Sequence, residues 1–227
     1  MKKFIIFLLF SLVIISCQKK NEKIKVIKNI RDVEEMFQLK NYKTQVRMAS
    51  NDSTDHITAQ LGDFTLSGDI DTKLNCKTGI WSLKNRTDSK EIQIDYIAFD
   101  KNDVFKNQIV FKEHNKIDSS ASKFYITKDK NPKELVLKFF SPKMQDELSK
   151  EAKVGYRIYR GSKRIKDDSI TYKDVKEGKY LSKINFTFKK GDKIVGSFSE
   201  FVTSKNSRSK DSLIMGNNTI YFIEKIE

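Results

Sequence analysis

The stretch of sequence that decides the fold is residues 180–202, YLSKINFTFKKGDKIVGSFSEFV. Apolar and polar residues alternate along 184–188, and a Lys-Lys-Gly-Asp turn at 189–192 leads into a second apolar run that begins at Ile194. Alternation with a period of two is typical of a strand that buries one face, and glycine followed by aspartate is typical of a turn. We therefore predict a β-hairpin here. Its register stays open, because the return strand has apolar residues on both faces.

The same pattern recurs over most of the chain. Runs that alternate, or that are rich in β-branched and aromatic residues, occur at 44–48, 56–61, 64–70, 79–83, 92–99, 108–112, 122–127, 135–140, 154–160, 180–188, 193–202 and 219–226. Turn residues separate several of them, at 100–103, 131–132, 191–192 and 216–218. Many short strands and few helical stretches predict an all-β protein of antiparallel sheets, arranged as a sandwich, a barrel or a meander.

One short helix is predicted ahead of the strands, at residues 29–40. Asn29 can cap it, and Asp32 stands three residues later, as in a capping box. Val33 and Phe37 fall on one helical face together with Ile30.

The charged segment 128–133 holds one of the two prolines and is the predicted seam between two domains. Residues on either side include enough aromatic and aliphatic side chains for a core. We therefore predict an N-terminal β-rich domain at residues 29–130 and a C-terminal β-sandwich-like domain at residues 131–227.

The first residues have the three-part organisation of a secretory signal. Lys2 and Lys3 precede an uncharged run at 4–16, which is shorter than the roughly 20 apolar residues that span a bilayer. The run ends in Ile-Ile-Ser-Cys at 14–17, which resembles the lipobox of bacterial lipoproteins. That resemblance implies removal of a signal peptide, residues 1–16, and a diacylglycerol on the sulfur of Cys17. The alternatives are an ordinary signal peptide or a buried core segment.

The residues after Cys17 are predicted to form a lipidated tether, residues 17–28. The sequence QKKNEKIKVIK at 18–28 is mostly polar and lysine-rich, and such a composition buries too little apolar surface to fold alone. Two or more acyl chains on Cys17 would hold the chain firmly on a membrane. Gln18, not Asp, follows the cysteine, and similarity to the enterobacterial sorting rule implies the outer membrane, with the protein facing the periplasm.

Cys76 is the second of the two cysteines. If Cys17 is acylated, Cys76 has no intramolecular partner, and a lone thiol in an exported protein is buried, intermolecular or reactive. We predict burial, because free cysteine behaves as a small apolar residue.

The chain is strongly basic, with a formal net charge of +14, or +12 without Lys2 and Lys3. A basic chain raises nucleic acid as a partner, but export behind a lipid anchor argues against it. The remaining anionic candidates are lipid head groups, lipopolysaccharide phosphates or an acidic protein. Lysine outnumbers arginine 37 to 7, which indicates solvated surface positions more than dedicated phosphate sites.

One cationic cluster stands apart, at residues 155–164, which hold three of the seven arginines. Its candidate anion-contacting residues are Arg157, Arg160, Lys163 and Arg164. The alternative interpretation is an exposed strand that positive charge guards against edge pairing.

The stretch Gly79-Ile80-Trp81, with Asp95-Tyr96 and the strand 108–111 downstream, resembles the Gly-x-Trp hairpins of MORN-type repeats. The resemblance covers about residues 62–124 and has one clean instance, so only Gly79 and Trp81 match the repeat. Such repeats occur in antitoxin-like lipoproteins of Bacteroidota, where successive hairpins stack into a sheet. The alternative is that Trp81 is a core aromatic residue at the start of a strand.

Residues for catalysis are sparse. His56 and His114 are isolated and lie in no metal-binding spacing. Asp52 and Asp55 could bring a carboxylate to the His56 imidazole, but they lie in ordinary turn composition. We therefore predict no catalytic residue, no cofactor and no metal site.

These observations predict a lipid-anchored cell-envelope lipoprotein that acts as a non-enzymatic binding or scaffold module. Its partners would be the membrane, through Cys17, and an unidentified envelope protein, with no nucleic acid. The first alternative is an immunity or antitoxin-like lipoprotein that neutralises a secreted toxin. The second is an envelope hydrolase that gathers carboxylates around His56 or His114.

Overall fold

A computed structural model describes residues 30–143, 147–173, 178–205 and 212–227. The chain divides into two compact units, residues 1–38 and residues 39–227. The first contains α2 (Ile30–Met36), and the second contains the 3-10 helix η1 (Leu39–Asn41) and all the strands. The protein is all-β, with antiparallel sheets, as predicted.

The predicted helix at 29–40 is therefore a short α-helix followed by a 3-10 turn. Val33 and Phe37 are buried, which agrees with their predicted place on one apolar face. The predicted cap, Asn29, lies outside the described residues. No helix within the described ranges is both long and apolar enough to cross a membrane.

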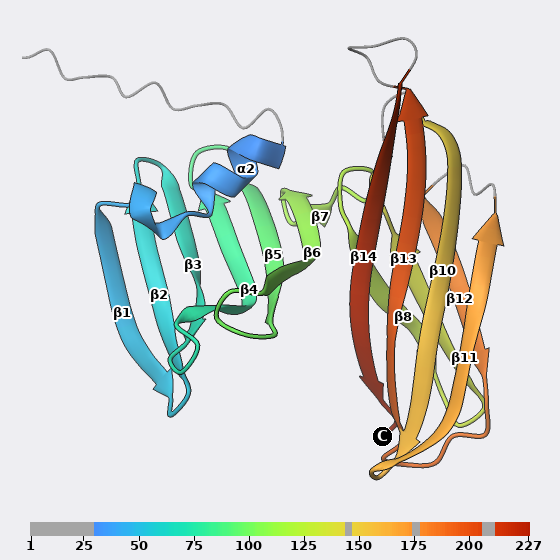
Figure 1. The fold of residues 1–227 in the computed structure, drawn as a ribbon. Coiled ribbons are helices and arrows are strands. Elements are labelled where there is room, and N and C mark those ends of the chain that lie inside the picture. The colour runs from blue at the N-terminus through green and yellow to red at the C-terminus, as the bar shows by residue number, and fades with distance from the viewer. Residues whose placement is uncertain (1–29, 144–146, 174–177, 206–211) are drawn as a thin grey trace, which may run out of the picture. The chain divides into compact units, whose positions relative to one another are not determined.

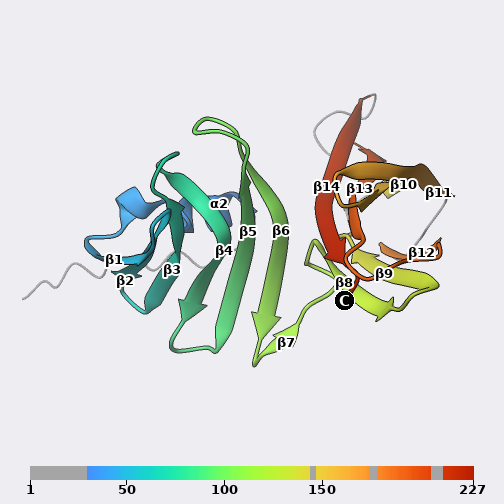
Figure 2. The same ribbon diagram turned by 90° about the horizontal axis from the view of Figure 1, so that it is seen from below.

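The first sheet is an antiparallel meander in which each strand pairs with the next along the chain (Figures 1 and 2). Its strands are β1 (Thr44–Asn51), β2 (Thr54–Leu61), β3 (Phe64–Asp71), β4 (Cys76–Asn85), β5 (Lys90–Ala98), β6 (Val104–Glu113) and β7 (Lys116–Ile117). Burial alternates along the central strands, so that Leu66, Trp81 and Ile94 lie on one buried face. This is the period-two pattern from which the strands were predicted.

Trp81 is the largest fully buried side chain of the chain's described part. Its indole N–H donates to the backbone carbonyl of Asp69 over 2.9 Å. A Cβ atom at Gly68 would lie 2.3 Å from the indole ring, so only glycine leaves room for it there. Trp81 is thus a core aromatic residue, as one of the two interpretations predicted, but it lies in the middle of β4 and not at the start of the strand.

The remaining strands form two sheets that enclose one apolar core, with the orders β12–β9–β8 and β11–β10–β13–β14 (Figure 2). Their bounds are β8 (Phe124–Lys130), β9 (Glu134–Phe140), β10 (Glu147–Arg160), β11 (Lys163–Lys173), β12 (Lys179–Asn185), β13 (Lys193–Lys205) and β14 (Leu213–Lys225). The core takes side chains from both sheets, and the rings of Phe139 and Phe198 stack with centroids 4.8 Å apart. These strands form a β-sandwich.

The predicted hairpin at 180–202 is wrong. Strand β12 pairs with β9, whereas β13 pairs with β10 and β14, so the two strands lie in different sheets. The connection crosses between the sheets, where Phe188 is buried and its N–H donates to the carbonyl of Pro132 over 2.8 Å. Period-two alternation shows that a strand buries one face, but it does not identify the partner strand.

Two boundaries also differ from the prediction. The predicted domain boundary at 130/131 lies inside the β8–β9 hairpin. The first strand of the sandwich is therefore β8, which begins at Phe124. The predicted turn at 216–218 lies within β14, which pairs with β13 without a register shift. Strand β11 was not predicted, because its exposed, charged sequence lacks an apolar face.

Candidate interaction site

Strand β14 is an edge of the four-stranded sheet, and only one of its sides is paired with a strand, β13. In an antiparallel pair, alternate residues direct the backbone N–H and C=O away from the partner strand. On β14 these include Ile223, together with Thr219 and Tyr221, whose backbone groups bond to side chains outside the sheet. By the same alternation, Leu213, Met215 and Asn217 direct theirs to the same side.

The C-terminal half of this edge is covered by side chains from β6, from β8 and from the residue before β8. The Asn107 amide makes two bonds to Tyr221, accepting from its N–H over 2.6 Å and donating to its carbonyl over 3.1 Å. The Lys123 ammonium donates to the carbonyl of Thr219 over 3.1 Å. The Tyr125 side chain lies near the backbone N–H of Ile223. We call residues 219–223 the covered β14 segment.

These covering side chains are largely shielded from water. Asn107 is buried, and its amide also donates to Asp95 over 2.9 Å. Burial, together with the neighbouring Lys106, lowers the pKa of Lys123 to about 8. Burial and the nearby Glu224 raise the pKa of Tyr125 to about 12. Shielding of this kind strengthens the hydrogen bonds that hold the covered β14 segment.

The N-terminal half of the same edge has no such cover within the described ranges. We call residues 213–217 the open β14 segment. No described side chain or strand bonds to the outward backbone groups of Leu213, Met215 and Asn217. Leu213 is 63% exposed and Met215 is 79% exposed. Phe201, which lies opposite Asn217 on β13, is 50% exposed and completes an apolar patch with Leu213 and Met215.

The other long sheet edges have features that discourage pairing. Strand β1 has a register shift near its end and an exposed arginine, Arg47. Strand β8 has a register shift followed by charged residues, and β11 is lysine- and aspartate-rich. On β12, the carbonyl of Leu181 accepts a hydrogen bond from the Tyr172 hydroxyl over 3.0 Å. Shifts and charges are the usual protection of edge strands, and the open β14 segment has neither.

A buried polar network lies on the inner face of the sandwich behind the open β14 segment. At its centre is Glu200, which accepts from the Tyr180 hydroxyl over 2.6 Å, from the Asn218 amide over 2.9 Å and from Ser141. Lys150 pairs with Glu200 over 3.3 Å and with Glu147 over 3.0 Å. Burial raises the pKa of Tyr180 and hydrogen bonding to Glu200 raises it further, so the hydroxyl stays protonated.

This network holds the two strands that carry the apolar patch. Glu200 precedes Phe201 on β13, and Asn218 follows Asn217 on β14. Because neighbouring residues of a strand face opposite sides, the inward network fixes the position of the outward patch. A buried charge cluster of this kind depends on every partner being present.

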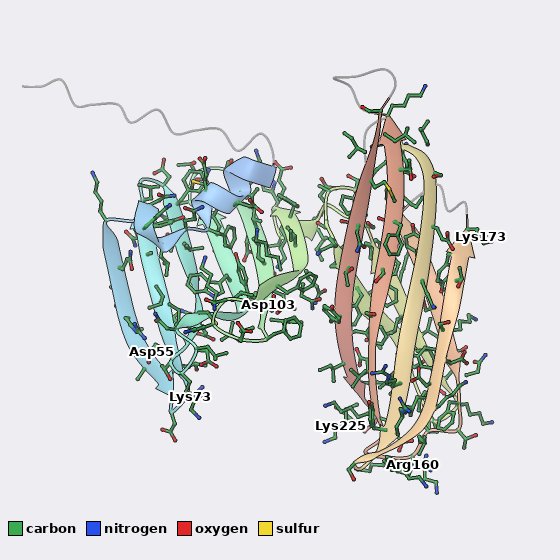
Figure 3. All side chains as sticks on the ribbon, viewed as in Figure 1. Asp55, Lys73, Asp103, Arg160, Lys173 and Lys225 are labelled. Atoms are coloured by element: carbon green, nitrogen blue, oxygen red, sulfur yellow. The ribbon has the colours of Figure 1, made fainter. Side chains whose placement is uncertain are left out.

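The predicted anion-contacting residues lie on the β10–β11 hairpin, and three of the four are paired with carboxylates. Arg157 and Arg164 both bond to Asp167, over 3.1 and 3.2 Å. Arg160, at the end of β10 (Figure 3), binds the buried Asp192 through two bonds of 2.8 Å. Lys163 is exposed at the start of β11. An anion would therefore compete with existing ion pairs, and contact with an anion stays a prediction.

The histidines and acids singled out in the sequence are not brought together. His56 bonds through Nδ1 to Asp69 on β3 over 2.7 Å, whereas Asp55 pairs with Arg47 over 2.5 Å. Asp52 lies in the β1–β2 turn, and His114 lies after β6 with a positive φ of 49°. Among the described residues, no group of three His, Cys, Asp or Glu side chains is placed to hold a metal ion.

The two cysteines fall in different parts of the chain. Cys76 begins β4 and is partly exposed, so its predicted burial is wrong. Desolvation, with Asp71 and Asp100 nearby, raises the pKa of its thiol. Cys17, the signal peptide and the tether lie outside the described residues, and lipidation of Cys17 stays a prediction.

In comparisons with known proteins, the chain matches no protein-family model and no curated protein sequence. The resemblance to MORN-type repeats therefore stays a prediction.

The open β14 segment was missed because 216–218 looked like a turn. A signal was present in the uncharged run Leu213-Ile214-Met215, which continues the predicted strand toward the N-terminus. The covered β14 segment had no local signal, because Asn107 and Tyr221 are 114 residues apart in sequence.

Proposed function

We propose that this chain is a lipid-anchored cell-envelope lipoprotein that binds another envelope protein and does not act as an enzyme. The observation that carries the proposal is the open β14 segment, an uncharged sheet edge beside exposed Leu213, Met215 and Phe201. An unguarded edge with exposed apolar side chains is a surface suited to pairing with another chain.

The anchor in this proposal rests on the sequence Ile-Ile-Ser-Cys at 14–17 and on the lysine-rich stretch that follows it. An acylated Cys17 would hold the sandwich near the outer membrane, on the periplasmic side. Tethering raises the local concentration of a binding module beside membrane-bound partners, so a modest contact becomes effective.

The second candidate is an immunity or antitoxin-like lipoprotein. It is favoured by one observation: residues 62–124, where Gly79 and Trp81 resemble a MORN-type hairpin, include consecutive hairpins of a single meander. The basic charge of the chain would suit an acidic toxin. A toxin gene beside the gene for this chain would support that candidate.

The test is a crosslinking pull-down of the full-length, tagged protein from envelope membranes, compared with the Cys17→Ser variant. We expect one specific protein partner with the wild-type chain and a strong reduction with Cys17→Ser, which should also leave the membrane fraction. Equal membrane retention of both forms would contradict the anchor. Recovery of lipid alone would contradict the protein-binding function.

A further inference from the structure

We propose that the open β14 segment extends its sheet by accepting one strand of an acidic partner, which places both apolar and acidic side chains on the sheet face of Leu213, Met215 and Lys205. This inference rests on the proposed function and names the kind of partner and the mode of binding. It rests on three properties of the site: backbone groups, apolar side chains and charge.

The backbone supplies the first argument. Leu213, Met215 and Asn217 each direct an N–H and a C=O away from β13, and an added strand would satisfy these groups. The covered β14 segment shows what this edge requires, because Asn107 and Lys123 provide the equivalent bonds there. Side chains therefore satisfy the outward backbone groups in the covered β14 segment, and a partner strand would satisfy them in the open β14 segment.

The side chains supply the second argument. Met215 and Leu213 share one face of β14 with Phe201, which lies across the pair from Asn217. A strand laid along this edge would place every second side chain on that face, against the apolar patch. This spacing selects a partner with apolar residues at alternate positions.

The charge around the open β14 segment indicates which of two binding partners, a second copy of this chain or an acidic strand, fits the edge. Lys205 is exposed directly across from Leu213, and Lys153 is exposed across from Ser199 on the same sheet face. Among the described residues of this outward sheet face, Glu151, across from Phe201, is the acidic residue beside the patch. A second copy, without Lys2 and Lys3, would bring another chain of net charge +12 to the same edge, whereas an acidic strand would be attracted. We therefore commit to an acidic strand and not to self-association.

The experiment measures binding of a synthetic fluorescent peptide, Glu-Thr-Val-Thr-Val-Thr-Glu, to the full-length protein in detergent by anisotropy. Its glutamates and valines share one face of an extended strand. Met215→Pro removes one outward N–H at an edge position, and we expect at least tenfold weaker binding. Met215→Thr keeps the strand but removes apolar contact, and we expect about fivefold weaker binding. The matched control is Ile223→Thr, an exposed β14 residue in the covered β14 segment, which should bind as the wild type does.

Two further peptides test the contributions of charge and of backbone hydrogen bonds separately. A peptide with lysine in place of each glutamate should bind at least tenfold more weakly, and raised salt should weaken the acidic peptide. A peptide N-methylated at its central amides should not bind, because it cannot form the backbone bonds. Undiminished binding by the N-methylated peptide, or by Met215→Thr, would overturn the proposal. If the envelope partner is captured equally by Met215→Thr and the wild type, the proposed function stands and this binding mode fails.

Discussion

At the scale of single residues, Asp192 explains how the chain crosses between the two sheets of the sandwich. Its carboxylate is buried, binds the Arg160 guanidinium through two bonds and accepts from the N–H of Lys189 over 2.9 Å. The hydrogen bonds from Arg160 are the largest cause that holds the pKa of Asp192 below its ordinary value. The sequence indicated a turn at this position, but the ion pair depends on a residue 32 positions away.

We expect the contribution of Asp192 to stability to disappear in acid. Because its pKa is lower in the folded than in the unfolded state, the carboxylate stabilises the fold above pH about 4, and the effect is lost as the pH falls further. Asp192→Asn should lower the free energy of unfolding by about 2 kcal/mol at pH 7 and by much less near pH 3. Denaturant unfolding at both pH values measures this, with the exposed turn variant Asp103→Asn as control. A loss that is equal at both pH values would contradict the ion-pair explanation.

Gly68 gives a second prediction at this scale. Gly68→Ala would place a methyl group against the Trp81 ring, and we expect a loss of about 2–3 kcal/mol in the free energy of unfolding. Gly155→Ala on β10 is the matched control, because a Cβ atom there meets nothing within 4 Å. Its effect should be below about 0.5 kcal/mol. Similar losses for both variants would show that strand glycines matter through the backbone and not through the contact with Trp81.

At the scale of elements, the sequence was informative about strands and uninformative about their partners. The all-β class and the Asp100–Asp103 turn follow from local patterns, and the structure confirms them. The pairing of β12 with β9 does not follow, because alternation reports burial alone. The candidate site could not be predicted for a related reason. The covered and open β14 segments belong to one strand, and they differ only in their contacts with β6 and with the region of β8, which are distant in sequence.

The cover on β14 can be tested at Asn107. Asn107→Ala would leave both backbone groups of Tyr221 without their partner, and we expect a loss of about 2 kcal/mol in the free energy of unfolding. Asn102→Ala, in the exposed turn before β6, is the control and should change stability little. Equal stability of the two variants would show that water replaces the Asn107 amide without cost.

At the scale of the whole molecule, we propose a membrane anchor at Cys17, a lysine-rich tether at residues 17–28 and a sandwich whose open β14 segment is an unguarded edge among the described strands. The anchor came from Cys17 and the preceding residues, and the edge came from the structure alone. The two proposals together predict a module that is held at the membrane and presents a short strand template to an acidic partner.

Hydrogen exchange at the backbone amides of β14 tests this binding mode most directly. In the isolated full-length protein, the amide of Tyr221 should exchange slowly, and those of Met215 and Asn217 should exchange quickly. In the complex with the captured envelope partner, Met215 and Asn217 should become at least tenfold slower, with little change at Tyr221 and Ile223. Fast exchange at Met215 and Asn217 in that complex would contradict strand addition at the open β14 segment.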